Sequence, residues 1–184
     1  MKAVRIYTKR GDDGTTGLLY GGRISKADPA TEAYGSVDEA VAALGVVRAE
    51  ADASLASEIL QIQRDLFVVG ADLAANPEER AKLEPGVSLA SSDMVDRLEQ
   101  LIDRMVEQHP LPQEFIVPGA NRVSAALDVA RGNVRRAERR TVEARDGGRE
   151  VNPEVLRYLN RLSDALFVLA RWQAGETEER SRDR

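Results

Sequence analysis

A cluster of arginines lies in the segment 122–145, whose apolar residues repeat at helical spacing. At about 100° per residue, Arg131, Arg135 and Glu138 fall on nearly one line of such a helix. We call the basic surface around that line the arginine stripe; its members are Arg131, Arg135, Arg136, Arg139 and Arg140. Planar guanidinium groups offer forked donors that match phosphate oxygens. The stripe indicates either anion recognition or a solvated helix face whose ion pairs contribute little.

Three further polar residues stand at helical positions. Asn160 and Asp164 are four residues apart in the apolar segment LNRLSDALFVLAR, so they share one helix face. They form either a buried structural hydrogen bond or a polar notch that holds a metal-bound phosphate. Asp38 lies in the first turn of an expected helix. There it is either a favourable charge at the positive end of the helix or the partner of an arginine across a subunit interface.

The segment 7–17, YTKRGDDGTTG, resembles half of a phosphate-binding loop. Its lysine precedes the glycines, whereas a Walker loop places the lysine after them. Successive backbone N–H groups can form a nest for anionic oxygens, to which Lys9 and the threonine hydroxyls would add donors. Lys26 follows on the next loop. The segment is therefore either an anion-binding loop or a flexible N-terminus.

Two aromatic side chains stand beside proline turns. Phe115 opens the segment FIVPGAN and serves either as a core anchor or as an apolar wedge against a planar cofactor. His109 is the chain's single histidine and lies between a helical run and the turn PLP, which predicts an exposed residue at a helix end. A ferritin-type di-metal centre needs paired Glu-x-x-His motifs, so one histidine excludes that class.

Composition limits the remaining classes. The chain has 184 residues, 42% hydrophobic and 31% charged, which indicates one globular domain over residues 1–174 with a disordered tail over 175–184. A net charge of −5 argues against a general nucleic-acid binder, although a helical nucleic-acid or polyphosphate-binding module that uses the arginine stripe remains the alternative. The absence of cysteine, of a long apolar run and of a signal sequence predicts a cytoplasmic protein without membrane contact.

The elements that must position these residues are mainly helices. After a short strand at 3–8, Ser36 and Glu39 form a capping box that predicts a first helix over 37–52. A second helix carries an apolar stripe from Ile59 to Leu73, a third repeats that spacing from Val95 to Met105, and the fourth covers 122–145. The fifth opens at Asn152 and Pro153, a cap followed by a first-turn proline. The sequence therefore predicts an all-α bundle of five helices.

Six segments in register resemble the ATP:cob(I)alamin adenosyltransferase family of the propanediol-utilisation type. They are TKRGDDGTTG, SKADP, EAYGSVDE, FIVPG, ARGNVRRAERR and YLNRLSDALFVLAR, and the resemblance extends from Ile6 to about Trp172. It implies a ferritin-like, up-down five-helix bundle that forms a homotrimer with active sites between subunits. The implied reaction transfers the 5′-deoxyadenosyl group of ATP to the cobalt of cob(I)alamin and releases triphosphate.

The resemblance also implies roles for single residues. ATP would contact Thr8, Lys9, Arg10, Gly11, Asp12, Gly14, Thr16, Gly17 and Lys26 of one chain, and Arg135, Arg136, Ala137, Glu138, Arg139, Asn160 and Asp164 of its neighbour. Arg131 would form an intersubunit ion pair with Asp38, and Phe115 would cover the lower face of the corrin. Glu138 and Asn160 are the candidates for reaching Mg²⁺, directly or through water.

Two positions depart from the family pattern. The usual Pro-Gly-Gly reads Pro118-Gly119-Ala120, and Asp128 stands where histidine is common. The resemblance also implies an electron-donating reductase as a partner and allows delivery of the product to a cobalamin-dependent mutase. K⁺ is a further cofactor that the resemblance allows.

Overall fold

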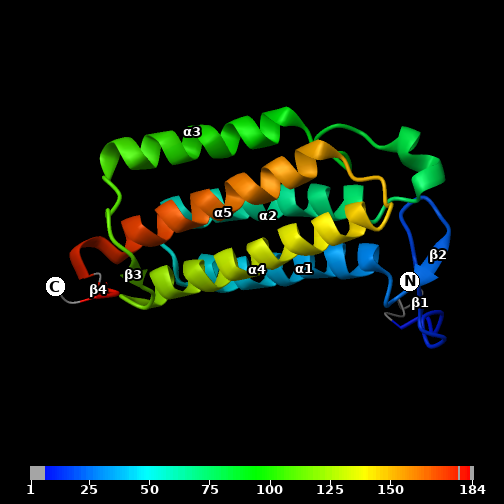
Figure 1. Cartoon of the computed structure of the whole chain (residues 1–184), viewed down its shortest axis with the longest axis horizontal. Helices are drawn as coiled ribbons and strands as arrows, with labels where there is room; N and C mark the ends of the chain where they lie inside the picture. Colours follow the sequence, from blue (N-terminus) through cyan, green and yellow to red (C-terminus); the bar gives the residue numbers. More distant parts are fainter. Residues whose placement is uncertain (1–6, 178, 183–184) are drawn as a thin grey trace, which may run out of the picture.

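The computed structural model describes residues 7–177 and 179–182, and it is mostly helical. The long helices are α1 (Pro29–Glu50), α2 (Ala53–Leu73), α3 (Ser92–Gln108), α4 (Arg122–Asp146) and α5 (Pro153–Ala174). They lie side by side along the long axis, and successive helices run in alternate directions (Figure 1). Two short 3₁₀ helices, η1 (Pro77–Lys82) and η2 (Gly175–Thr177), follow α2 and α5.

The start of α1 corrects the predicted first helix. Asp28 caps α1, because its carboxylate accepts a hydrogen bond from the Ala30 N–H at 2.8 Å, and Pro29 occupies the first turn. Ser36 and Glu39 lie inside α1, where Ser36 is buried, so the predicted capping box is wrong. The same chemistry was predicted correctly for α5, where Asn152 accepts from the Glu154 N–H before Pro153.

The core is aliphatic and lies between the helices. α1 packs against α2 and α4, α4 packs against α5, and α5 packs against α3. The predicted apolar stripe of α2 is buried as expected, with Ile59 and Leu66 fully covered. Leu127 and Val134 of α4 and Leu159 of α5 complete the shared core. Burial of these stripes explains why the predicted bounds of α2, α4 and α5 agree with the structure within a few residues.

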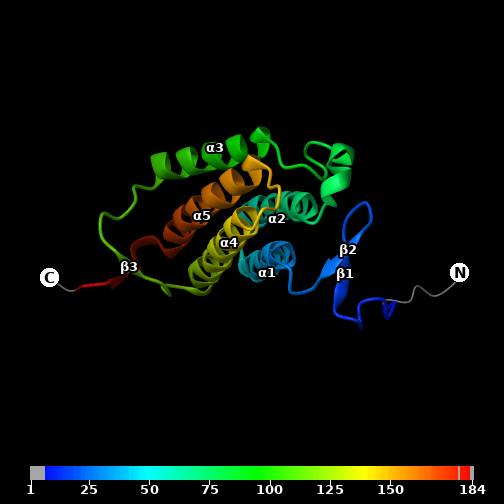
Figure 2. The ribbon, with the colours of Figure 1, turned by 45° about the vertical axis from the view of Figure 1, so that its right-hand side comes forward.

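Two small antiparallel sheets lie at opposite ends of the helices (Figures 1 and 2). At one end, β1 (Thr15–Gly17) pairs with β2 (Arg23–Ser25). At the other end, β3 (Ile116–Val117) pairs with β4 (Glu179–Arg180). The predicted disorder of the tail is therefore wrong for β4, which is held by β3. Of the predicted strand 3–8, residues 3–6 lie outside the described residues, and Tyr7 and Thr8 are not in a strand.

None of the helices that the structure describes combines the length and the apolar character needed to cross a membrane.

Candidate functional site

The glycine-rich segment before β1 forms a defined loop. The Lys26 ammonium donates to the Gly11 carbonyl at 2.8 Å, and the Lys26 N–H donates to the Gly14 carbonyl at 2.9 Å. Gly14 has a φ of 81°, a left-handed conformation that suits glycine. Lys9 has a φ of 59°, which is uncommon for a residue with a side chain. The structure thus joins Lys26 to the loop, and both remain at the surface.

Asp13 shapes the end of this loop next to β1. Its carboxylate accepts hydrogen bonds from the Thr15 hydroxyl at 2.8 Å and the Thr15 N–H at 2.9 Å, and Arg23 lies 3.5 Å away. These hydrogen bonds, with a smaller contribution from Arg23, lower the pKa of Asp13 below its ordinary value. The charged carboxylate therefore holds the turn from which Thr16 and Gly17 continue into the hairpin.

The arginine stripe divides into paired and unpaired members. Arg136 contacts Glu39 at 3.2 Å and donates to Asn133 at 2.7 Å, and Arg140 donates to Glu143 at 2.7 Å. Arg135 and Arg139 are exposed and form no hydrogen bond or ion pair with any residue of 7–177 or 179–182. These two guanidinium groups are one helical turn apart, so both can donate to one anionic ligand.

The predicted ligand residues beside the stripe occupy different environments. The Asn160 amide donates to the Glu138 carboxylate at 3.0 Å, which joins α5 to α4. Asn160 and Asp164 are exposed, so the alternative of a buried structural hydrogen bond is wrong. Ala137 is fully buried in the core, so its side chain does not join the exposed surface of Arg135.

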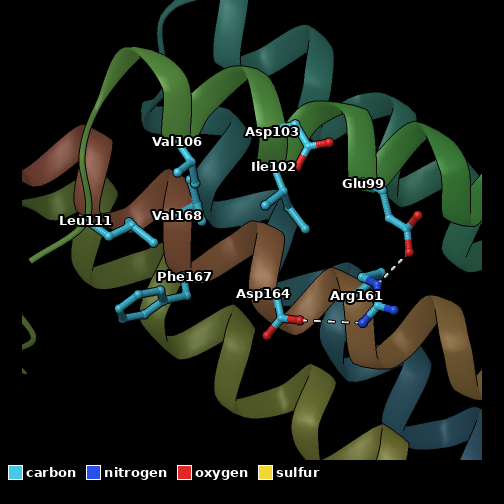
Figure 3. A pocket seen from close by; sticks show the side chains of 9 residues that line it. All are labelled: Glu99, Ile102, Asp103, Val106, Leu111, Arg161, Asp164, Phe167 and Val168. Carbon is cyan, nitrogen blue, oxygen red and sulfur yellow. Dashed lines mark hydrogen bonds and ion pairs between the residues drawn. The ribbon is translucent and has the colours of Figure 1, made fainter. Parts of the chain in front are cut away.

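A groove of about 490 Å³ runs between α3 and α5 (Figure 3). Its lining residues are Glu99, Ile102, Asp103, Val106, Leu111, Arg161, Asp164, Phe167 and Val168. Arg161 bridges the two helices, because its guanidinium donates to Glu99 at 2.7 Å and lies 3.9 Å from Asp164. The groove combines an apolar floor with charged walls.

A second groove, of about 440 Å³, lies between α1 and α2 and is mainly apolar. Asp38 lines it together with Tyr34 and Phe67, and Phe67 is well exposed. Asp38 is well inside α1, so the alternative in which it balances the positive end of that helix is wrong. It is instead an exposed carboxylate beside an apolar surface.

Arg131 occupies the boundary between α4 and α5. Its Nε lies 3.5 Å from the Asp128 carboxylate, and its guanidinium carbon lies 5.8 Å from the centre of the Phe167 ring. Asp128 also forms a short ion pair with Arg171, whose guanidinium carbon is 5.4 Å from the same ring. Within the described chain, Arg131 therefore meets Asp128.

Phe115 is 86% exposed, so the alternative of a core anchor is wrong. It immediately precedes β3, at the end of the molecule opposite the glycine-rich loop (Figure 1). The 25 residues of α4 separate these ends, and a helix of that length spans about 37 Å. One chain therefore does not bring Phe115 and Lys9 together. His109 is exposed at the end of α3, as predicted, and stacks beside Trp172.

The described residues contain no cluster of three or more side chains of the histidine, aspartate or glutamate type that could enclose a metal ion. Glu138 offers one half-buried carboxylate, and Asn160 places its amide against it. Mg²⁺ commonly binds one or two protein ligands and completes its shell with water and substrate phosphates. The Glu138 carboxylate fits that role, whereas the Asn160 oxygen accepts a bond from Arg161 at 3.2 Å.

Sequence reasoning missed the pairing of Asp128 with Arg171. Asp128 was noted only as a departure from a pattern, and Arg171 was passed over at the end of an apolar segment. A charged residue inside such a segment is the available signal, because a buried guanidinium requires a carboxylate nearby. The pairing itself joins residues 43 apart and cannot be read from local spacing.

Comparison with known proteins agrees with the sequence motifs. The family model for cobalamin adenosyltransferase matches residues 6–173. A corrinoid adenosyltransferase of Citrobacter freundii is 45% identical over 174 residues, covering 91% of this chain and 93% of that protein. The corrinoid adenosyltransferase PduO of Salmonella typhimurium is 42% identical over 178 residues, which cover 95% of this chain and 51% of PduO.

Comparison with solved structures also finds corrinoid adenosyltransferases. A variant PduO-type ATP:corrinoid adenosyltransferase from Lactobacillus reuteri, complexed with cobalamin and ATP, superimposes with a TM-score of 0.84. The two are 33% identical, and the match covers 92% of this chain and 93% of the other.

Proposed function

The chain belongs to the cobalamin adenosyltransferase family, and from this premise we infer that it transfers the 5′-deoxyadenosyl group of ATP to the cobalt of cob(I)alamin. The products are adenosylcobalamin and triphosphate. Besides the family match, the observation that carries the proposal is the pair of exposed guanidinium groups of Arg135 and Arg139, which have no hydrogen-bond or ion-pair partner among residues 7–177 and 179–182. No general base is needed, because the reaction removes no proton.

We propose that the active site is completed by a second copy of the chain in a homotrimer of up-down five-helix bundles. The reaction joins the 5′ carbon of ATP to cobalt, so the triphosphate site and the corrin site must be adjacent. The loop with Lys9 and Lys26 and the Phe115 turn lie at opposite ends of one chain (Figure 1). Pairing Arg131 of one copy with Asp38 of the next would bring the complementary ends together.

The cationic residues would stabilise the negative charge of the leaving triphosphate. Negative charge increases on the triphosphate as cobalt attacks the 5′ carbon, so donors already in place lower the barrier most. We assign this role to Arg135 and Arg139 from one copy and to Lys9 and Lys26 from the neighbour. Arg136 would assist after exchanging its contact with Glu39 for a phosphate oxygen. Backbone N–H groups from Gly11 to Gly17 would surround the remaining oxygens.

When bound, Mg²⁺ would neutralise part of the triphosphate charge. Glu138 is the residue we propose to hold it, directly or through water. Asn160 would orient that carboxylate through its 3.0 Å hydrogen bond. Asp164 lies one turn further along α5, where it keeps Arg161 on the wall of the groove between α3 and α5.

We propose that the apolar groove beside Asp38 contacts the corrin and that Phe115 covers its lower face. An exposed phenylalanine on a turn can exclude water and the lower axial ligand from cobalt(II). Loss of axial donors makes addition of an electron easier, so Phe115 would assist reduction to cobalt(I). An electron-donating reductase is then required as a partner, and a reducing cytoplasmic location agrees with the absence of cysteine.

The decisive experiment mixes the protein with ATP, Mg²⁺ and chemically reduced cobalamin without oxygen. We expect a light-sensitive alkylcobalamin to form, visible in the absorption spectrum. Product no faster than in a protein-free control would show that the proposed reaction is wrong.

The role of Phe115 is tested by comparing two assays of Phe115→Ala. We expect a loss of about 100-fold when cobalt(II) and a reductase are supplied, because the axial ligand stays bound, and a smaller loss with cobalt(I) already formed. Val87→Ala, at another exposed apolar position, is the control and should retain activity. Equal losses of Phe115→Ala in the two assays would contradict the ligand-displacement role.

A further inference from the structure

The turn between β1 and β2 is attached to the end of α2 through its backbone. The Leu19 N–H donates to the Ala74 carbonyl at 2.9 Å, and the Leu19 carbonyl accepts from the Asn76 N–H at 3.0 Å. Tyr20, the next residue of the turn, has a φ of 66°, which is uncommon for a residue with a side chain. An isolated two-stranded hairpin is only marginally stable, so contacts outside the hairpin are needed to hold this conformation.

The connection between α4 and α5 lies beside the end of α2, at the same end of the molecule as the hairpin (Figure 1). From this connection, the Arg149 guanidinium donates to the Ala75 carbonyl at 2.7 Å. The Arg149 N–H donates to the Ala144 carbonyl at 3.0 Å, so Arg149 is itself fixed to the last turn of α4. Ala75 is buried, and burial lowers the pKa of Arg149 below its ordinary value. A hydrogen bond from a charged donor is strongest in such surroundings.

One peptide unit joins the contact of Arg149 to the contact of the hairpin. The Ala75 carbonyl and the Asn76 N–H belong to the same planar unit, in which they point in opposite directions. Arg149 holds the carbonyl, and this sets the direction in which the N–H points toward Leu19. A cation on the carbonyl also polarises the unit and makes its N–H a better donor.

We propose that Arg149 is a positioning residue that holds the β1–β2 hairpin in place for ATP through this peptide unit. The inference rests on the proposed function, in which ATP lies against the glycine-rich loop. Thr16 and Gly17 are in β1 and Lys26 directly follows β2, so these three proposed ATP contacts move with the hairpin. Arg149 acts on them through the backbone of Leu19.

Calorimetric titration of the protein with ATP in the presence of Mg²⁺ tests this role. Arg149→Met keeps most of the side-chain length and removes the donor. We expect the Kd for ATP to rise about tenfold, because ATP binding must then order the hairpin. The KM for ATP should rise similarly, whereas kcat at saturating ATP should stay within about twofold of wild type, because bound ATP supplies the missing order. Arg149→Lys retains a charged donor and should recover most of the affinity.

The matched control is Arg97→Met, which removes an arginine that pairs with the buried Asp65 at 3.0 Å. This pair joins α3 to α2 and does not involve the hairpin. The control should lower the melting temperature, because Asp65 loses a charged partner, and should leave the Kd for ATP within about twofold of wild type.

Hydrogen exchange provides a second readout that depends neither on turnover nor on ATP. The Leu19 and Asn76 amides should exchange faster in Arg149→Met than in wild type, because their hydrogen bonds open more often. The Leu66 amide, in the middle of α2, should keep its protection in both proteins.

The outcomes keep this inference apart from the proposed function. A wild type that binds ATP and makes no adenosylcobalamin would reject the proposed reaction, and the ATP affinity of Arg149→Met would still decide the inference. Unchanged affinity in Arg149→Met, or an equal loss in Arg97→Met, would show that Arg149 only stabilises the fold. A wild type that does not bind ATP would overturn both proposals.

Discussion

The buried aspartates of α2 and the exposed arginines of α4 differ in whether their charges have partners within the chain. Asp72 is 1% exposed, and its carboxylate accepts hydrogen bonds from Arg80 at 2.7 Å, the Ala90 N–H at 3.0 Å and the Asn152 amide at 2.8 Å. Arg135 and Arg139 have no such partners among the residues described. The α2 carboxylates therefore fasten elements of one chain, while the α4 cations remain available to a ligand.

Asp65, the second buried aspartate of α2, follows the same rule. It accepts from Arg97 at 3.0 Å, from Gln61 at 3.0 Å and from the Tyr158 hydroxyl at 3.4 Å. A charge withdrawn from water persists only with such partners, because its desolvation is unfavourable by several kcal/mol. An exposed charge needs none. Water satisfies the exposed Arg135, and its lack of a partner among the described residues leaves the guanidinium available to a ligand.

Among the variants that test this comparison, we expect Asp72→Ala to have the largest effect. Three donors lose their acceptor, one of them the charged Arg80, so we expect the free energy of unfolding to fall by about 3–5 kcal/mol. Urea unfolding followed by circular dichroism measures it. The control Glu107→Ala removes an exposed carboxylate and should change that energy by no more than about 0.5 kcal/mol. A loss below about 1 kcal/mol for Asp72→Ala would mean that its network does little to hold α2, η1 and α5 together.

Arg135→Ala should leave the fold intact and remove activity. Loss of a donor to the leaving triphosphate is expected to lower turnover by about 100-fold, with an unchanged helical circular-dichroism signal. The matched control is Arg140→Ala, because Arg140 lies on the same helix but is paired with Glu143. Its turnover should stay within about twofold of wild type. If the two variants retain similar activity, the stripe is only a solvated face.

The smallest effect is expected for Tyr158→Phe, which deletes one long hydrogen bond to Asp65 at a cost of about 1 kcal/mol. Burial, reinforced by the charge of Asp65, raises the pKa of Tyr158 well above its ordinary value. The folded state therefore keeps a proton that the unfolded chain releases above about pH 10, so wild-type stability falls as pH rises beyond that point.

Tyr158→Phe has no hydroxyl to titrate at this position, so its free energy of unfolding should fall less steeply as the pH rises. Urea unfolding of both proteins at about pH 8 and about pH 11 measures the difference. Parallel losses in the two proteins would contradict the proposed titration of Tyr158.

Local sequence patterns predicted most helix bounds but not the start of α1. The stripes of α2 and α5 and the cap at Asn152 are local features, and local chemistry decides them. Ser36 and Glu39 had the correct spacing for a cap, yet Asp28 and Pro29 begin the helix eight residues earlier. A capping box stabilises a helix start only where the preceding residues are not helical. Here the residues from Pro29 continue the helix and pack against α2 and α4.

The candidate site was predicted only in part, because only some of its features depend on residues that are close in sequence. The arginine stripe follows from residues close in sequence, whereas the contact of Lys26 with the Gly11 carbonyl joins residues 15 apart. The exposure of Phe115 and Asn160 does not follow from nearby residues. The apolar character of a residue or of a helix does not show which of its faces a neighbouring element covers. Only the packing of α4 against α5 placed Asn160 on Glu138 and Arg171 on Asp128.

By itself, the sequence determined the helical class and the family, and it identified the charged residues that we propose to contact a triphosphate. Those properties depend on residue type and on spacing of a few positions, where helix geometry leaves little freedom. Among the described residues, the tertiary structure decided which charges have a partner in the chain and which are left to solvent. It also placed the glycine-rich loop and Phe115 at opposite ends of the helices. These properties depend on contacts between distant segments, which only the packed core establishes.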